Sequence, residues 1–217
     1  MGASFEEQYA AAADRVLNGA GRDTFNAIRT LESADPSKYQ PEHGADYPRS
    51  AFGQALRQIA QLSKADVGLE VAFADLGGWD THVNQGGAQG QLATRLDDFG
   101  RSIAALVTDL GDRMADTVVL TMSEFGRAVN ENGNRGTDHG HGNAMMVIGG
   151  GVRGGRVYGK WPGLGREQRY DARDLAVTTD FRDVFAEIVV RHLGLTNPSA
   201  VFPGYSIKAD NFPGLFA

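Results

Sequence analysis

Two short polar motifs contain three of the five histidines in the chain. In the segment 77–82, Asp80 and His82 are two residues apart, and in 138–142 His139 and His141 have the same spacing. Side chains at this spacing project to the same side of an extended segment. Imidazole nitrogens and carboxylate oxygens suit zinc, manganese or iron. The candidate metal ligands, which include one acidic residue just after a predicted strand, are Asp80, His82, Glu124, Asp138, His139 and His141.

Each of these residues also has a plainer interpretation. An aspartate readily hydrogen-bonds the backbone of a turn, and Asp80 can instead orient His82 from outside the ligand shell of a metal. Glu124 also suits the first turn of a helix that begins after Ser123. We prefer metal binding because both motifs and Glu124 follow predicted strands. The expected cofactor is a divalent metal, zinc or manganese, as one ion or two.

The elements that must position these motifs are predicted from hydrophobic spacing. Short β-prone runs at 69–74, 117–122 and 144–148 predict strands, and an apolar stripe from Leu92 to Leu110 predicts a helix of about five turns. Strand, helix and strand in this order predict a parallel, right-handed βαβ unit. In a parallel sheet, ligand sites lie at the carboxyl ends of the strands. The fold class expected is therefore α/β, with a mostly parallel sheet flanked by helices.

Further helices are predicted at 5–19, after Ser50 as N-cap, and after Thr179 or Asp180 as N-cap. The polar segment 123–142 is predicted to be a long functional loop, and Gly154-Gly155 a hairpin turn. We expect one α/β domain over 1–217, with a helical and irregular lead (1–49), a core (50–195) and an irregular tail (196–217).

The composition restricts the partners. The formal net charge of −6 argues against nucleic acid or an anionic membrane as the main partner, although basic residues are frequent between 127 and 169. No apolar run approaches the roughly 20 residues that span a bilayer, and the first residues do not form a secretory signal. There is no cysteine, so thiolate metal sites and disulfides are excluded. The oligomeric state is left open.

Taken together, the motifs resemble a bacterial family called domain of unknown function 1501. The resemblance covers roughly residues 50–195 and rests on 77–82, 121–127, 136–143, 149–155 and 178–182. That family is similar to the alkaline phosphatase and sulfatase superfamily, which implies an α/β fold with a metal site. The resemblance implies that Asp80 and His82 lie near the first metal-binding loop. It also implies that Asp138, His139 and His141 supply an Asp-His pair, to which Glu124 contributes.

The chain departs from the superfamily pattern in two respects. The superfamily spaces the Asp and His of its first loop four apart, whereas Asp80 and His82 are two apart. Its nucleophilic Ser or Thr comes from an N-terminal strand and helix, and nothing before residue 50 matches that segment. Family members are about twice as long and often begin with a twin-arginine export signal. We therefore expect this chain to be the C-terminal half, a partial domain of an exported protein.

Two functions are compatible with these features. The first is a metal-dependent hydrolase of phosphate or sulfate esters, in which Arg127 binds a small anionic substrate and steadies the developing negative charge. The alternative is a non-catalytic binding or assembly module that retains the superfamily fold, because the nucleophile segment is missing.

Overall fold

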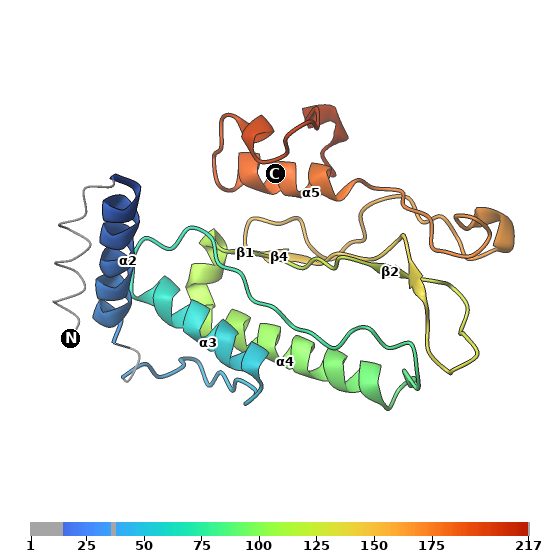
Figure 1. Ribbon diagram of the computed structural model, residues 1–217, viewed down its shortest axis with the longest axis horizontal. Coiled ribbons are helices and arrows are strands. Elements are labelled where there is room, and N and C mark those ends of the chain that lie inside the picture. The colour runs from blue at the N-terminus through green and yellow to red at the C-terminus, as the bar shows by residue number, and fades with distance from the viewer. Residues whose placement is uncertain (1–14, 36–37, 217) are drawn as a thin grey trace. The chain divides into compact units, whose positions relative to one another are not determined.

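The protein is described by a computed structural model over residues 15–35 and 38–216 (Figure 1). The chain divides into two compact units, which are described separately below. The first takes the described residues of Met1–Gly77 together with Asp97–Gly111, and the second comprises Gly78–Leu96 and Asp112–Ala217. Helices and small sheets are mixed, as expected for α/β character. Among the described residues, no helix combines the length and apolar character needed to cross a bilayer.

The first unit is helical. It contains α2 (Arg15–Ser33), α3 (Ala51–Lys64) and the later part of α4 (Gln91–Leu110). The Ser50 side chain accepts a hydrogen bond from the Gly53 amide, which confirms the predicted N-cap of α3. α3 and the later part of α4 lie side by side in Figure 1. The Phe52 ring of α3 stacks on the Phe99 ring of α4, with ring centroids 5.8 Å apart. The predicted helix at 5–19 falls mostly outside the described residues.

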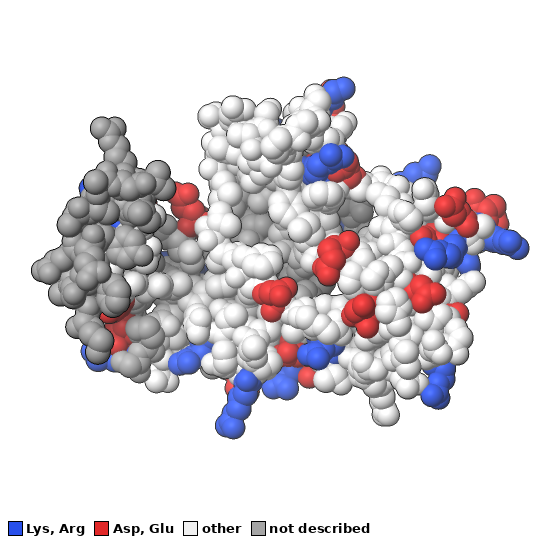
Figure 2. Space-filling model, in the orientation of Figure 1, with Lys and Arg blue, Asp and Glu red and all other residues white. Residues whose placement is uncertain are grey.

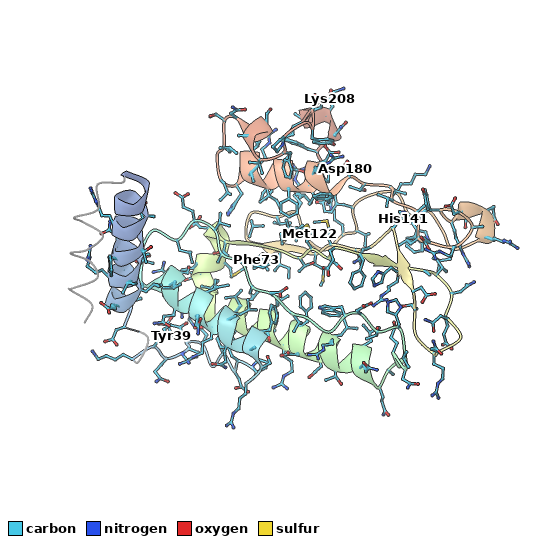
Figure 3. The ribbon with its side chains drawn as sticks, in the orientation of Figure 1. Tyr39, Phe73, Met122, His141, Asp180 and Lys208 are labelled. Carbon is cyan, nitrogen blue, oxygen red and sulfur yellow. The ribbon has the colours of Figure 1, made fainter. Side chains whose placement is uncertain are left out.

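One predicted strand is not formed. Residues 69–74 form no strand, and their apolar side chains face solvent: Val71 is 72% exposed, and Phe73, which is labelled in Figure 3, is 86% exposed. A β-prone sequence becomes a strand only when another strand satisfies its backbone hydrogen bonds, and no strand pairs with this run in the described chain. The parallel βαβ unit expected from the sequence is therefore absent from the described residues.

The sheets of the second unit form one long β-hairpin instead. Strand β1 (Val118–Leu120) pairs with β4 (Val147–Gly149), and β2 (Gly126–Arg127) pairs with β3 (His139–Gly140), both antiparallel. The register shifts by one residue between the two pairs, as at a β-bulge. The segment 123–142, predicted to be a loop, is thus the outer arm and tip of this hairpin. A chain that returns directly on itself pairs antiparallel, so both strand pairs of the described residues are antiparallel, and a mostly parallel sheet stays a prediction.

Helix α5 (Phe181–Arg191) packs on the inner part of the hairpin. Val184 and Ile188 of α5 are buried with Leu215, against Val118 and Val147 of the strands. The Asp180 side chain accepts from the Arg182 amide, which confirms it as the N-cap. The predicted hairpin at Gly154-Gly155 is not formed. Val152 forms its β-bridge with Phe216 of the tail instead.

The remaining elements of the described chain are short 3-10 helices. They are η1 (Gly111–Asp116), η2 (Arg166–Gln168), η3 (Pro198–Ala200) and η4 (Ala209–Asn211).

Candidate metal centre

Both histidine motifs lie in the second unit, where the loop after Gly78 runs along the tip of the β-hairpin. Backbone hydrogen bonds join the two segments: Asn84 donates to the Asn134 carbonyl, Gln85 to the Arg135 carbonyl, and Thr137 to the Thr81 carbonyl. The loop 79–85 and the hairpin tip 128–138 therefore hold each other in place. Residues about 50 positions apart in the sequence become neighbours by this pairing.

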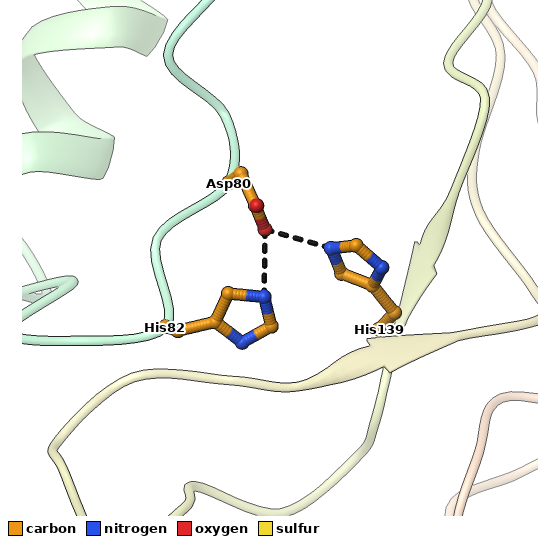
Figure 4. A group of neighbouring side chains, drawn as sticks. All are labelled: Asp80, His82 and His139. Atoms are coloured by element: carbon orange, nitrogen blue, oxygen red, sulfur yellow. Dashed lines mark hydrogen bonds and ion pairs between the residues drawn. The ribbon is translucent and has the colours of Figure 1, made fainter.

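The Asp80 carboxylate lies between two imidazole rings (Figure 4). Its Oδ1 atom is 2.8 Å from Nε2 of His82 and 2.7 Å from Nε2 of His139. The rings of the two histidines are 4.8 Å apart. One oxygen and two nitrogens, all within 4.8 Å of one another, are potential ligands for a metal ion. Among the described residues, Asp80, His82 and His139 are the acidic and histidine side chains whose ligand atoms lie close enough together to bind one metal ion.

Asp138 contacts the opposite edge of the His82 ring. Its Oδ1 is 3.2 Å from Nδ1 of His82 and accepts a hydrogen bond of 2.9 Å from the Asn132 side-chain amide. A carboxylate on the second nitrogen of a metal-binding histidine fixes its tautomer and ring orientation. In this structure Asp138, predicted as a metal ligand, therefore has the place of an orienting carboxylate, a role that the sequence analysis offered for Asp80 only as an alternative.

Asn132 organises the tip that holds Asp138. Its side-chain oxygen accepts from the amides of Asn134 and Gly136, and its amide group also donates to the His82 carbonyl. All of its side-chain contacts thus fix the two segments that carry the cluster. The sequence analysis missed Asn132, and its position in an Asn- and Gly-rich segment is the only signal that pointed to it.

The His139 ring is held by aromatic stacking. Phe125 lies parallel to it with ring centroids 4.3 Å apart, and the Arg127 guanidinium lies over the Phe125 ring at 4.7 Å. His139 begins β3 directly opposite Arg127 of β2. The hairpin register thus sets the position of the imidazole, and Phe125 fixes its plane.

Arg127 joins the two segments through backbone carbonyls. Its guanidinium donates to the Thr137 carbonyl at 2.7 Å and to the Trp79 carbonyl, and it approaches Asp80 Oδ1 at 3.4 Å. The side chain is 23% exposed. These contacts make it a clamp between loop and hairpin tip, and its proposed role in substrate binding stays a prediction.

Two glycines allow the backbones to approach closely. A Cβ atom on Gly136 would lie 2.2 Å from the carbonyl carbon and oxygen of His82. A Cβ on Gly140 would lie 2.5 Å from the Arg127 carbonyl group. Any larger residue at either position would separate the segments that carry the cluster.

Two further predicted ligands, Glu124 and His141, do not belong to this group. Glu124 is exposed. The Nδ1 atom of His141 contacts Asp174, a buried residue that the sequence analysis did not identify. The three ligand candidates that come together are Asp80, His82 and His139.

The surroundings keep the aspartates ionised. The hydrogen bond from His139, followed by the charges of nearby basic groups, holds the pKa of Asp80 below its ordinary value. For Asp138, the hydrogen bonds from Asn132 and then His82 hold the pKa below its ordinary value. Both side chains are 55% exposed and within reach of ions from solution. Acidic and basic residues are intermixed on the face shown in Figure 2.

The donor set fits a divalent transition metal. A neutral imidazole carries one N–H, so His82 can donate to Asp138 or to Asp80 but not to both. With the proton on Nδ1, the Nε2 lone pair of His82 faces the lone pairs of Asp80 Oδ1. A cation between them would satisfy both. Ligand atoms in a tetrahedral zinc site lie about 3.3 Å apart, so small side-chain movements would suffice.

An open pocket lies beside the loop and the hairpin tip that carry the cluster. It has a volume of about 420 Å³ and is lined by 84–87 of the loop and by Glu131, Arg135, Gly136 and Thr137 of the hairpin tip. The Thr81 and Thr137 hydroxyls beside it both donate to the Gln85 side-chain oxygen. Both hydroxyls are therefore used to hold the loop.

Comparison with known proteins gives a family and no activity. The family model described as "Protein of unknown function (DUF1501)" matches residues 5–203. No curated protein and no solved structure matches the chain significantly. The match confirms the family expected from the motifs, while the likeness to alkaline phosphatases and sulfatases stays a prediction.

Proposed function

We propose that this chain, which belongs to the DUF1501 family, binds a divalent metal ion through Asp80, His82 and His139 and hydrolyses phosphate or sulfate esters. The observation that supports it is the position of Asp80 Oδ1, within 2.8 Å of an imidazole nitrogen on each of two separate segments. Two histidines and one carboxylate leave a coordination position open, as catalytic zinc sites do.

Zinc or manganese is the metal that we propose. The three donors are nitrogen and oxygen atoms, and the chain has no cysteine that would favour softer metals. When bound, such an ion supplies Lewis-acid polarisation of an ester oxygen and lowers the pKa of a water molecule. One ion accounts for the three converging ligands.

The residues around the cluster would position the reactants. Asp138 orients His82, and Phe125 keeps the His139 ring in its plane, so the ligands are pre-organised. Because Thr81 and Thr137 are both hydrogen-bonded to Gln85, we propose water as the nucleophile in place of a side-chain hydroxyl. The open pocket, with Arg135 on its wall, would accept the remainder of a small anionic ester.

The choice of phosphate and sulfate esters rests on the motifs. Their resemblance to the alkaline phosphatase and sulfatase superfamily suggests this substrate class, and the Asp and His ligands agree with its chemistry. An alkaline phosphatase-like fold belongs to the same proposal. In that interpretation, the β-hairpin belongs to a larger sheet, and α5 covers one face of it.

Metal binding is tested by calorimetry on protein stripped with a chelator. We expect one equivalent of Zn²⁺ or Mn²⁺ to bind wild type, and His139→Ala to weaken binding at least tenfold. His192→Ala is the matched control, because it removes a histidine outside the cluster. Wild type that binds neither ion would refute the proposal.

Hydrolysis is tested with 4-nitrophenyl phosphate and 4-nitrophenyl sulfate on the metal-loaded protein. Turnover that requires the metal and disappears in His139→Ala supports the enzyme. The alternative is a non-catalytic binding or assembly module, favoured by the engagement of both nearby threonine hydroxyls. Metal binding without turnover of either ester would support the module over the hydrolase.

A further inference from the structure

A further histidine, His141, lies two residues after His139 in the sequence and contacts the buried carboxylate of Asp174. Nδ1 of His141 lies 2.8 Å from Oδ2 of Asp174. The Asp174 side chain is 1% exposed, whereas that of His141, which is labelled in Figure 3, is 52% exposed. A buried acid is therefore paired with an accessible imidazole, an arrangement that neither metal binding by the cluster nor packing of the core requires.

The backbone around Asp174 is firmly held. Asp174 forms β-bridges with Ala128 and with Tyr170, and the neighbouring Leu175 carbonyl accepts from the Gly142 amide. The segment 170–175 thus runs along the hairpin arm on both sides of Asp174. The carboxylate has little freedom to move away from His141.

Arg173 balances the charge of the buried carboxylate. Its Nε is 2.7 Å from Asp174 Oδ1, its Nη2 donates to Oδ2 at 3.0 Å, and Nη2 also donates to the His139 carbonyl at 3.2 Å. Asp174 therefore faces a guanidinium on one side and the His141 ring on the other. The ring also lies 4.3 Å from the Tyr170 ring, which restricts its rotation.

These contacts select one tautomer of neutral His141. Because an ionised carboxylate can only accept, the nitrogen that faces Asp174 must carry the hydrogen. The hydrogen is on Nδ1, and the lone pair is on Nε2. Asp174 contacts Nδ1 and not Nε2 of His141. The His141 side chain is half exposed.

The backbone of His141 lies close to that of a proposed metal ligand. His139 and His141 are separated by one residue, and two residues of extended chain span at most about 7 Å. We propose that Asp174 is a positioning residue that presents Nε2 of His141 as a hydrogen-bond acceptor for a water molecule or an alcohol hydroxyl beside the centre. Use of this acceptor in turnover rests on the proposed function, but the Asp174–His141 geometry does not.

The tautomer is measured directly in metal-free protein. Long-range ¹H–¹⁵N correlation spectra distinguish the two neutral tautomers, and His141→Gln identifies the resonances of His141. We expect the Nδ1–H form in wild type and in Asp171→Asn, which removes an exposed acid from the same segment. Asp174→Asn should give a mixture of forms. An Nε2–H form in wild type, or an unchanged tautomer in folded Asp174→Asn, would overturn the proposal.

Turnover tests the use of the acceptor. In zinc-loaded protein, Asp174→Asn should lower kcat for 4-nitrophenyl phosphate about tenfold, with KM and zinc affinity unchanged. An unchanged kcat, or a lost zinc site, contradicts the positioning role. If zinc-loaded wild type shows no turnover, the hydrolase proposal fails, and the tautomer alone decides whether Asp174 positions His141.

Discussion

Nε2 of His139 lies 2.7 Å from Oδ1 of Asp80, although 59 positions separate the two residues in the sequence. The contact depends on the hairpin: β3 pairs with β2 opposite Arg127, and Arg127 in turn binds the Trp79 carbonyl next to Asp80. Antiparallel pairing and one arginine thus bring a carboxylate and an imidazole together. Asp138, Gly136 and Arg127 each hold one part of this arrangement in place.

Asp138→Asn tests the orienting role of the second aspartate. Asparagine has the same shape but a weaker, uncharged acceptor, so we expect zinc affinity to fall about tenfold while the fold is retained. Calorimetry on chelator-treated protein measures the change. Asp116→Asn removes an exposed aspartate outside the cluster and should leave the affinity at its wild-type value. Equal affinities for Asp138→Asn and wild type would show that Asp138 does not orient His82.

Gly136→Ala tests the close approach of the two segments. The added Cβ would lie 2.2 Å from the His82 carbonyl group, so the backbone must separate and the ligands with it. We expect zinc binding to be lost or weakened at least tenfold, since a displaced ligand costs more than a misoriented one. Gly133→Ala is the matched control, because its Cβ would meet no atom within 4 Å. Similar zinc affinities in the two variants would contradict the geometry of the tip.

Arg127→Met tests the clamp between loop and tip. It removes both hydrogen bonds to backbone carbonyls, so the free energy of unfolding should fall by about 1–3 kcal/mol. Urea denaturation measures this loss. Arg127→Lys should recover only part of it, because an ammonium cannot form the same planar fork to two carbonyls. If the Arg127 side chain only binds substrate and does not stabilise the fold, both variants will be as stable as wild type and will differ from it only in KM.

Asp109→Asn tests a buried ionic group in the first unit. Asp109 is fully buried and accepts from the Tyr39 and Tyr47 hydroxyls, and the Lys64 ammonium lies 2.5 Å away. Neutralising it leaves Lys64 with an ion pair to Glu42, which is 63% exposed, and with its cation–π contact to the Tyr39 ring. We expect a loss of about 3 kcal/mol in the free energy of unfolding. Asp46→Asn, at an exposed position of the same unit, should change little.

The same aspartate predicts a pH dependence. Burial alone would raise the pKa of Asp109, but the hydrogen bonds led by those from Lys64 and Tyr39 outweigh it and lower the pKa. A lowered pKa in the folded state stabilises the protein fully above the ordinary aspartate pKa. This contribution of Asp109 to the free energy of unfolding is lost as the pH falls through its lowered pKa. Wild type should thus lose more stability than Asp109→Asn below about pH 4, and parallel acid denaturation curves would contradict this.

The sequence predicted α3, α4 and α5, but not the part of α2 beyond residue 19. The spacing from Leu92 to Leu110 predicted α4, and Ser50 and Asp180 were identified as N-caps because capping is a local interaction. Asp80, His82 and His139 were selected by residue type and short spacing. Each of these inferences uses information contained within a few neighbouring residues.

The strand pairing and the partners of each histidine could not be predicted in the same way. Whether β1 continues into a crossover or returns as a hairpin depends on contacts between Arg127, His139 and their neighbours, which sequence spacing does not encode. The role of Asp138 as the partner of His82 Nδ1, and of Asp174 as the partner of His141, also follows only from pairing. The partners in both pairs are far apart in the sequence, so neither contact could be predicted from short spacing.

The central claim is that Asp80, His82 and His139 bind one metal ion together. Anomalous diffraction from crystals of zinc-loaded protein, recorded on both sides of the zinc absorption edge, tests it most directly. We predict one peak about 2.0–2.2 Å from a carboxylate oxygen of Asp80 and from Nε2 of both histidines. A zinc peak bound elsewhere on the chain, or no peak at this cluster in crystals that contain zinc, would contradict the account.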